Sequence, residues 1–301
     1  METLHPTLAA VVREKTGLSW SRARKLCAEG RVTVDGERCL DAAARIRADA
    51  TVVVDAHGAK VERGLLAKGA IVFHDRDLVI VDKPAGMLTV GYEGEKDTLA
   101  ELARLMLRRL DREAHDTGLG VVHRLDKETS GLVAFTRTAQ AKRELAAQFR
   151  AHDLERSYVA LAQGAVVESR IETFFLDDRG DGLRGSWGHY RHAKGEPPPQ
   201  AKRAVTHVTP LEALQGATLA ECRLETGRQH QIRIHLAEAG HPVLGEKVYL
   251  RDFAGARLEA PRTMLHARTL GFAHPRSGKE MRFEREAPED FASRLESLRR
   301  R

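Results

Sequence analysis

Short apolar runs alternate with amphipathic stretches along this chain, a pattern that predicts a mixture of strands and helices. Runs of β-branched and aromatic residues predict strands at residues 71–73, 78–81, 132–135, 157–161 and 219–224. Apolar residues spaced three or four apart predict helices at residues 99–110, at residues 142–151 and at the end of the chain. A further helix is expected from about residue 230 until Gly240 and Pro242 stop it. We therefore expect an α+β protein, and the absence of an internal repeat argues against a solenoid.

The first 58 residues predict a small α/β module of their own. A first short helix is followed by a second, which a serine at position 19 or 21 can cap and Gly30 is expected to close. A strand at residues 32–34 leads into an Asp-Gly turn, and residues 52–54 predict a later strand. The second helix and the strand after it carry four cations, Arg22, Arg24, Lys25 and Arg31. These cations can either follow the phosphates of RNA or form an ordinary solvated face.

Composition divides the rest of the chain into three further parts. Residues 59–70 combine glycines with mixed charge and predict a linker. Residues 71–290 hold most of the predicted strands and form the larger domain, and residues 291–301 predict a helix with a basic outer face. Within the larger domain, residues 177–203 are poor in apolar residues and rich in Gly, Pro and charge. They predict a long exposed insertion between two strands.

The charge balance indicates a polyanionic partner. The 301 residues carry a formal net charge of +6 and a pI of about 9.3, which suits nucleic acid. Three cysteines, Cys27, Cys39 and Cys222, are too few and too scattered for a disulfide framework or a thiolate metal site. No secretory signal is visible, and no apolar run approaches the ~18 residues needed to span a bilayer. We therefore expect a soluble, cytoplasmic protein.

One polar loop, residues 123–131, lies between two apolar runs, so we expect it at strand ends on a rigid scaffold. Its sequence, His-Arg-Leu-Asp-Lys-Glu-Thr-Ser-Gly, places Asp126 between Arg124 and Lys127. The two cations favour the ionised form of this carboxylate. By local composition alone, an ordinary surface turn with a salt bridge is the simpler interpretation.

A second polar cluster, Thr-Gly-Arg-Gln-His-Gln-Ile-Arg-Ile-His, begins at Thr226. We expect Thr226 to cap a helix there and to expose backbone N–H groups that favour an anion. Ile232 and Leu236 lie four residues apart and are expected to face the core, while His230 and Arg233 share a neighbouring face. The cluster therefore offers an imidazole and a guanidinium side by side.

Three other kinds of chemistry fit the two clusters poorly. His230 and His235 lie five residues apart, on different helix faces, whereas a zinc-binding helix uses a spacing of four, and no acidic third ligand lies nearby. Ser130 lacks the Gly-x-Ser-x-Gly elbow of serine hydrolases. The chain contains neither a P-loop nor a Rossmann fingerprint. An Asp–Arg site on a basic RNA-binding protein remains, and we expect no metal in it.

The loop at residues 123–131 resembles the signature His-Arg-Leu-Asp-x-x-Thr-Ser-Gly of the RluA-type pseudouridine synthases. Four more blocks resemble the family in the same order: its first motif at residues 79–86, its tyrosine strand at 156–161, its third motif at 226–235 and a short block at 265–267. Residues 1–58 resemble the RNA-binding module named after ribosomal protein S4. The module usually has a Pro-Gly-Asp turn where this chain has residues 47–50, so the last turn is expected to differ.

The resemblance implies a mixed, mainly antiparallel central sheet flanked by helices, with an active-site cleft. It also implies isomerisation of uridine to pseudouridine in RNA without a metal or cofactor. Asp126 would be the catalytic carboxylate, which either attacks the anomeric carbon of the sugar or promotes elimination to a glycal. Arg233 would pair with Asp126 and orient it. Tyr158 would stack on the detached base and help to remove the proton from its carbon 5, and Leu265 would supply an apolar wall.

The resemblance also implies how RNA is held. The target base must leave its stack before it can react, and Arg124 matches the family arginine that enters the vacated space. Arg228 is expected to bind substrate as well, whereas Lys83, Pro84 and the rest of the signature loop are expected to be structural. The S4-like module indicates large-subunit ribosomal RNA as the substrate, with transfer RNA as the alternative, and a monomer is the expected state.

Two other classes of function stay open at this point. One is a ribosome-associated RNA-binding protein that keeps the fold without catalysis, although the expected Asp, Tyr and Arg are all present. The other is a nucleoside hydrolase that uses Asp126 on a glycosidic bond. The basic charge and the N-terminal module favour polymeric RNA over a free nucleoside.

Overall fold

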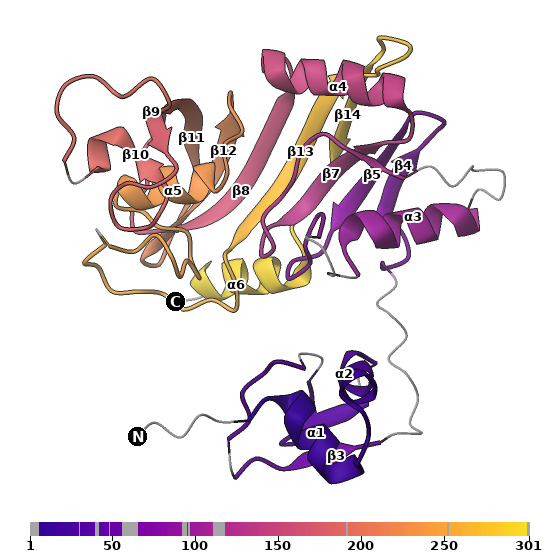
Figure 1. Ribbon diagram of the computed structural model, residues 1–301. Coiled ribbons are helices and arrows are strands. Elements are labelled where there is room, and N and C mark those ends of the chain that lie inside the picture. Colours follow the sequence, from indigo (N-terminus) through magenta and orange to yellow (C-terminus); the bar gives the residue numbers. More distant parts are fainter. Residues whose placement is uncertain are drawn as a thin grey trace. The chain divides into compact units, whose positions relative to one another are not determined.

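The structure is a computed structural model that divides into two compact units, one up to residue 65 and one from residue 66 onward. It describes residues 6–29, 31–39, 42–47, 49–55, 66–91, 95, 97–110, 118–190, 192–251 and 253–299. Each unit has its own sheet and its own helices (Figure 1). Among the described residues, no helix combines the length and apolar character needed to cross a membrane.

The first unit packs two helices against a small antiparallel sheet. Its elements are α1 (Leu8–Thr16), α2 (Trp20–Ala28), β1 (Val32–Val34), β2 (Glu37–Arg38) and β3 (Val52–Val54), with strand order β2-β1-β3. Thr7 caps α1 and Ser19 caps α2, because each side chain accepts a backbone N–H of the first turn. The expected elements are confirmed. Gly30 and Ala48, which belong to the expected helix end and to the divergent turn, lie outside the described residues.

One mixed, mainly antiparallel sheet forms the centre of the second unit. Its strands are β4 (Ile71–His74), β5 (Leu78–Lys83), β6 (Gly120–Val121), β7 (Ser130–Thr136), β8 (Glu155–Gln163), β9 (Ser169–Leu176), β10 (Gly185–Ser186), β11 (Lys202–Leu214), β12 (Ala217–Leu224), β13 (Leu265–Ala273) and β14 (Glu280–Glu284). Their order is β10-β9-β11-β12-β8-β13-β7-β5-β4, with β14 paired to β13 and β6 to β7. Only the contact of β13 with β7 is parallel among the described pairs. This architecture confirms the expected fold class.

Helices cover this sheet because its strands alternate their apolar side chains between two faces. The helices are α3 (Leu99–Leu110), α4 (Ala139–Ala151), α5 (Gln231–Glu238) and α6 (Glu289–Arg299). Val79 and Val81 pack with the buried face of α3, whereas Leu78 and Ile80 pack with Leu145 of α4 on the other side. Figure 1 shows α3 and α4 on opposite sides of these strands. The second half of the sheet packs its own core against α5 and α6.

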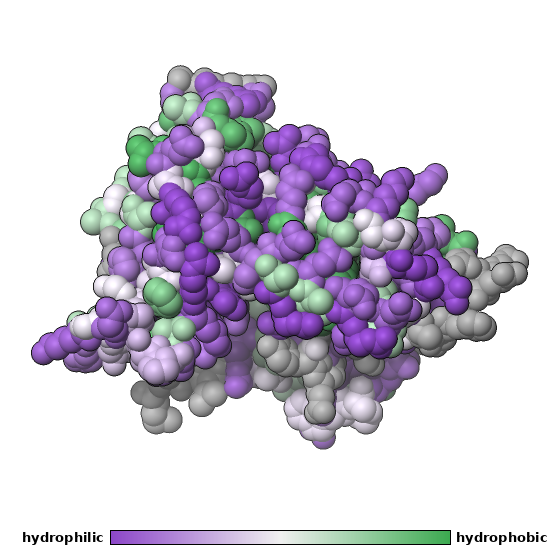
Figure 2. Space-filling model, turned by 90° about the horizontal axis from the view of Figure 1, so that it is seen from above, coloured by the Kyte–Doolittle hydropathy of each residue, from purple (hydrophilic) through white to green (hydrophobic). Residues whose placement is uncertain are grey.

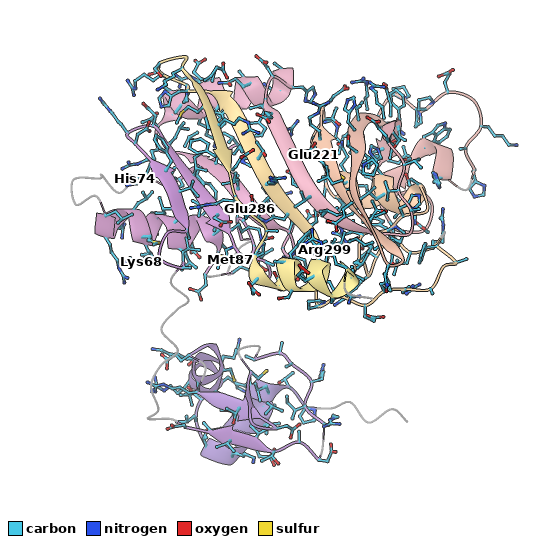
Figure 3. All side chains as sticks on the ribbon, turned by 180° about the vertical axis from the view of Figure 1, so that it is seen from behind. Lys68, His74, Met87, Glu221, Glu286 and Arg299 are labelled. Atoms are coloured by element: carbon cyan, nitrogen blue, oxygen red, sulfur yellow. The ribbon has the colours of Figure 1, made fainter. Side chains whose placement is uncertain are left out.

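The face of the molecule seen in Figure 2 is mostly polar. In the view from above, hydrophilic residues dominate and hydrophobic ones form small separate areas (Figure 2). Ion pairs also lie at the surface. For example, Arg299 of α6, labelled in Figure 3, binds both oxygens of Glu212. This surface suits a charged partner better than an apolar one.

The segment at residues 177–203 is more ordered than the sequence indicates, and the expectation of an exposed insertion is wrong for part of it. Its residues 185–186 form β10, which pairs with β9, and its last two residues begin β11. Arg179 is only 2% exposed and lies 3.5 Å from Glu238 of α5. A buried ion pair between the segment and α5 therefore anchors a stretch whose composition is that of a loop.

The expected bounds of the linker and of the terminal helix can be compared with the structure. The linker expected at residues 59–70 lies outside the described residues up to residue 65, and Leu66 and Ala70 are buried in the core beside α3. The terminal helix begins at Glu289, two residues before the expected start, and buries Phe291 and Leu298.

Gly131 allows the close parallel contact between β7 and β13. It adopts φ +113°, and a Cβ atom on it would lie 2.2 Å from the carbonyl oxygen of Ala267. We expect Gly131→Ala to lower the free energy of unfolding by about 2 kcal/mol or more. The new Cβ would clash with the backbone of Ala267, which the hydrogen bonds of β13 hold in place. Urea denaturation measures this loss. Gly188→Ala, where a Cβ meets no neighbouring atom, is the control and should change stability little.

His235 of α5 makes the folded state sensitive to acid. It is 1% exposed, and its ring nitrogens lie 2.8 Å from the hydroxyls of Thr206 and Thr173. Burial lowers the pKa of His235 to about 4 from its ordinary value of 6.5. Between these two pH values only the unfolded chain takes up the proton, so stability falls as pH falls.

We therefore expect His235→Gln to flatten the dependence of unfolding free energy on pH between 6.5 and 4. The slope should decrease by up to about 1.4 kcal/mol per pH unit relative to the unchanged protein. Urea denaturation at several pH values gives both slopes. Equal slopes would contradict the neutral, buried state of His235.

Candidate active site

A pocket of about 1250 Å³ opens on the second unit. Its walls come from the loop between β6 and β7, the end of α4, strand β8 and the turns on either side of α5. The expected site residues that line it are Asp126, Tyr158, Arg233, Arg124 and Arg228. Leu265 lines a smaller recess that shares most of these residues. The fold therefore brings together every site residue expected in this unit, although they extend from residue 124 to residue 265 of the sequence.

Hydrogen bonds from outside fix the loop that carries Asp126. The hydroxyl of Thr89 accepts from the Leu125 N–H at 3.1 Å and donates to the Leu125 carbonyl at 2.9 Å. The carbonyl of Lys127 accepts from the Gly86 N–H at 2.8 Å. The backbone on both sides of Asp126 is therefore held, which sets the direction of its side chain.

The buried side chain of Lys83 also binds the loop that carries Asp126. It is fully buried, and its ammonium donates to the carbonyls of Pro84, Met87 and Lys127 at 3.0, 2.7 and 2.9 Å. Met87, labelled in Figure 3, marks the turn that follows β5. Burial lowers the pKa of Lys83 to about 7, although the charge of Asp126 opposes this shift. These contacts agree with the structural role expected for Lys83.

Two side chains, half-buried His123 and buried Ser130, hold the ends of the loop. At one end, His123 accepts the Ala134 N–H through Nε2 at 2.9 Å and stacks on Phe149 with 4.7 Å between ring centroids. Burial lowers the pKa of His123 to about 3, so the neutral ring is available as an acceptor. At the other end, the Ser130 hydroxyl lies 3.0 Å from Nδ1 of His266. Both contacts fit residues that keep the loop in shape.

Asp126 faces one cation and one neutral imidazole. Its Oδ2 lies 3.4 Å from Nη1 of Arg233, and its Oδ1 lies 3.7 Å from Nε2 of His230. Burial lowers the pKa of His230 even though Asp126 opposes the shift, so this ring is uncharged at neutral pH. About a quarter of the Asp126 side chain, 26%, remains exposed. Its carboxylate is therefore paired with Arg233 but still accessible from the pocket.

A second carboxylate orients Arg233. Its Nε and Nη2 donate to the two oxygens of Glu246 at 2.7 and 2.8 Å. The Glu246 side chain is fully buried, and its Oε1 also accepts the N–H groups of Lys247 and Val248. Burial alone would lower the pKa of Arg233, but Glu246 and Asp126 raise it. Burial alone would raise the pKa of Glu246, but Arg233 lowers it, so both groups stay charged.

Tyr249 contacts both His230 and Arg233, the two side chains that face Asp126. Its hydroxyl lies 2.6 Å from Nδ1 of His230, and its ring lies 5.3 Å from the guanidinium carbon of Arg233. Burial raises the pKa of Tyr249 to about 12, so its hydroxyl stays protonated. His230 is thus fixed through one nitrogen while the other faces Asp126.

The helix that carries Arg233 begins near residue 230, as expected, but Thr226 does not cap it. α5 starts at Gln231, after His230, which adopts the left-handed conformation with φ 58°. The expected cap at Thr226 is wrong, because its hydroxyl donates to the Gln231 side chain and accepts the Val205 N–H, both at 2.8 Å. The hydroxyl that was expected to open an anion site instead ties this turn to β11.

Tyr158 lies on β8, opposite Cys222 of β12 and Ala267 of β13. It is partly buried, and its ring lines the pocket near Asp126. Burial raises the pKa of Tyr158, Arg156 opposes the rise and Asp126 adds to it. The phenol is therefore protonated at neutral pH.

The remaining expected residues differ in exposure. Arg124 is exposed on the pocket wall, and Nε of Arg228 donates to the carbonyl of Arg203 at 2.9 Å. In the first unit, Arg22, Arg24 and Lys25 are exposed on α2. The side chain of Arg31 is 13% exposed and lies 3.4 Å from Glu29.

Sequence reasoning assigned no role to Glu246, Tyr249, Thr89 or Arg156. Glu246 had one usable signal, since it follows an apolar pair and a glycine, an unusual place for a single carboxylate. The others had none, because hydroxyls and a strand arginine are common at such positions. Their roles come from contacts between segments far apart in the chain.

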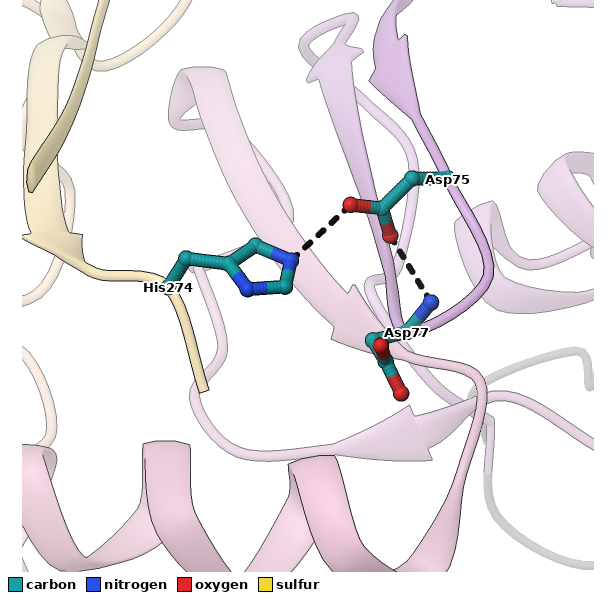
Figure 4. A group of neighbouring side chains, drawn as sticks. All are labelled: Asp75, Asp77 and His274. Atoms are coloured by element: carbon teal, nitrogen blue, oxygen red, sulfur yellow. Dashed lines mark hydrogen bonds and ion pairs between the residues drawn. The ribbon is translucent and has the colours of Figure 1, made fainter. Parts of the chain in front are cut away.

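One cluster outside the pocket contains possible metal ligands. Asp75, Asp77 and His274 place three ligand atoms within 4.8 Å of one another (Figure 4). His274 Nε2 lies 2.9 Å from one oxygen of Asp75, whose other oxygen accepts the Asp77 N–H. Two hydrogen bonds from Arg276 already satisfy Asp77 and lower its pKa. The cluster therefore joins the β4–β5 turn to the turn after β13 as a structural clamp.

Comparisons with known proteins agree with this geometry. Residues 77–238 match the family model described as RNA pseudouridylate synthase, and residues 8–52 match the S4 domain. Among solved structures, the human protein RNA Pseudouridylate Synthase Domain Containing 4 is similar, with a TM-score of 0.61 and 20% identity. That likeness covers 76% of this chain and 92% of the human one, and it bears on the fold alone.

Curated relatives are more similar in sequence. Ribosomal large subunit pseudouridine synthase D of Zymomonas mobilis is 37% identical over 231 residues, which are 73% of this chain and 70% of that protein. The protein of the same name from Pseudomonas aeruginosa is 33% identical over 294 residues, which cover 93% of this chain and 88% of that protein. With the pocket, the family match and these relatives in agreement, the chain belongs to the RNA pseudouridylate synthase family: it is an RNA pseudouridine synthase, an isomerase, that carries an S4 domain.

Proposed function

We propose that this enzyme converts specific uridines of large-subunit ribosomal RNA to pseudouridine, with Asp126 as its catalytic carboxylate. The observation that carries the proposal is the pairing of Asp126 with Arg233 at 3.4 Å in a pocket that Tyr158 also lines. The choice of RNA is supported by the relatives in Zymomonas mobilis and Pseudomonas aeruginosa, which are named for the large ribosomal subunit. The S4 domain supports a structured RNA substrate.

Asp126 starts the reaction at the sugar of the target nucleotide. In both routes that the family resemblance implies, attack on the anomeric carbon and elimination to a glycal, the acting group is an ionised carboxylate. Arg233 directs Asp126, and Glu246 prevents Arg233 from rotating away. The partial exposure of Asp126 leaves an oxygen accessible to the sugar.

Tyr158 acts on the detached uracil. After the base has turned, its carbon 5 bonds to the sugar and must lose a proton. We propose that Tyr158 stacks on the base during this turn and assists the loss of that proton. Because the pKa of Tyr158 is raised, the phenol would act as a hydrogen-bonded relay rather than as a free phenolate.

The remaining site residues would hold the RNA. Extruding a base from its stack costs a few kcal/mol, and exposed Arg124 is placed to occupy the space that the base leaves. Arg228 would bind substrate beside it, and Leu265 would form an apolar wall. The exposed cations of α2, with Arg31 at the following strand, would contact phosphates elsewhere on the RNA. We propose that a monomer does this in the cytoplasm without a metal or cofactor.

The direct test maps pseudouridines across all RNA of the source organism, with and without the gene. Carbodiimide adducts on pseudouridine block reverse transcription and mark each site. We expect one or more sites to disappear from large-subunit ribosomal RNA and to return when the gene is restored. Loss confined to transfer RNA would replace the proposed substrate, and no lost site at all would contradict the proposed function.

Asp126→Asn is expected to abolish pseudouridine formation while leaving RNA binding intact. The amide keeps the shape of the side chain but lacks the charge and nucleophilicity that either route requires. Tritium release from RNA labelled at carbon 5 of uridine measures turnover, and filter binding measures affinity. Turnover near that of the unchanged enzyme would refute the role of Asp126.

Glu246→Gln is expected to lower kcat by about 10- to 100-fold with little change in KM. The amide cannot hold two N–H groups of Arg233, so the guanidinium loses its fixed direction toward Asp126. Glu212→Gln is the matched control, because Glu212 binds Arg299 in the same two-bonded way but lies at the surface and does not line the pocket. Equal kcat values for the two variants would mean that Glu246 has no part in positioning Arg233.

A further inference from the structure

Arg156 is a buried cation in the wall of the active-site pocket. It lies on β8, two residues before Tyr158, and is only 6% exposed. Residues two apart on a strand share one face and lie about 7 Å apart. Arg156 and Tyr158 therefore lie on the same face of β8, and both line the pocket that contains Asp126. The guanidinium carbon of Arg156 lies 5.7 Å from the centre of the Phe149 ring, which supports it from one side.

The charge of Arg156 has no carboxylate partner among the residues that the structure describes. Its single hydrogen bond runs from Nη2 to the backbone carbonyl of Glu225 at 2.9 Å. The Glu225 carboxylate instead contacts Arg170, Arg203 and His207. Nε of Arg156 is buried with no acceptor. A buried cation is normally paired with an anion, so its environment is incomplete in the free enzyme.

The space beside Arg156 is open to the pocket. A Cβ atom on Gly227 would lie 2.5 Å from Nη1 of Arg156, so any larger residue there would press on the guanidinium. Gly227 lines the pocket together with Arg228 and His152. The absence of a side chain at position 227 therefore makes room for Nη1 of Arg156 in the pocket wall.

The surrounding field is positive. Burial lowers the pKa of His152, and the charges of Arg156, Arg228 and Arg203 lower it further, against a smaller opposing effect of Glu225. Asp126 pairs with Arg233 instead. An anion that entered between Arg156 and Arg228 would meet two guanidinium groups of the pocket wall.

We propose that Arg156 binds a backbone phosphodiester of the substrate RNA within two nucleotides of the target uridine. The inference rests on the proposed function, because it takes the base that stacks on Tyr158 to be the flipped uracil. The planar fork of Arg156 matches the geometry of a phosphate, and its burial makes the contact directional. Arg156 thereby places the target nucleotide relative to Asp126, a task separate from the opening of the stack by Arg124.

The test combines a substitution of Arg156 with the neutralisation of single phosphates in the RNA. Short RNAs that the enzyme modifies are made with one neutral methylphosphonate after a 2′-deoxynucleotide, at each linkage within two nucleotides of the target. RNAs with the same deoxynucleotide and an ordinary phosphodiester are the references. For the unchanged enzyme, neutralising one linkage should raise Kd about tenfold. For Arg156→Met, Kd should be raised already, and the same neutral linkage should have no further effect.

Controls separate this inference from loss of fold and from the proposed function. Arg143→Met removes one exposed charge from α4 outside the pocket, and we expect it to retain the full effect of the neutral linkage. Arg156→Lys keeps the charge without the fork and should restore part of the sensitivity; thermal melting confirms that each variant is folded. If every linkage affects Arg156→Met as much as the unchanged enzyme, the phosphate contact is refuted. Turnover of the unmodified RNA by the unchanged enzyme tests the proposed function separately.

Discussion

One guanidinium shared by two carboxylates organises this active site. Glu246 is sealed from solvent and takes two of the donors of Arg233, whereas Asp126 is partly exposed and takes a longer contact from a third. Because the buried acid satisfies most of the cation, the exposed acid remains paired without being immobilised. The unequal division of one charge lets Asp126 stay paired and still approach a substrate, which a symmetric buried pair would not permit.

The scaffold supports this arrangement by fixing the backbone of the loop that carries Asp126. Thr89 brackets the residue before Asp126, and the Lys83 ammonium and the Gly86 N–H both bind the carbonyl of Lys127. The parallel contact of β7 with β13 then sets how closely the loop approaches the strand that begins at Leu265. Rigid strands and a clamped loop thus provide the precision that separate mobile side chains could not.

Much of the fold could be predicted from the sequence because its strands and helices carry clear local periodicity, as in α3 and β7. Asp126 and Arg233 could be named together only because their motifs resemble those of a known family, since 106 residues separate them. The pairing of Glu246 with Arg233 could not be found, because a carboxylate reveals its partner only after the chain folds. The prediction that Thr226 caps the helix is wrong for a local reason. His230 adopts a left-handed conformation, so the helix begins only at Gln231.

The burial of Lys83 has a consequence for the chemistry of its amine. A lysine whose pKa is about 7 holds a substantial fraction of free amine at neutral pH, and such an amine reacts readily with acylating reagents. Lys83 has no exposed surface, so the reagent reaches it only when the turn after β5 and the loop around Asp126 separate. The rate at which Lys83 becomes labelled therefore reports how often the active site opens, without any probe being introduced into the protein.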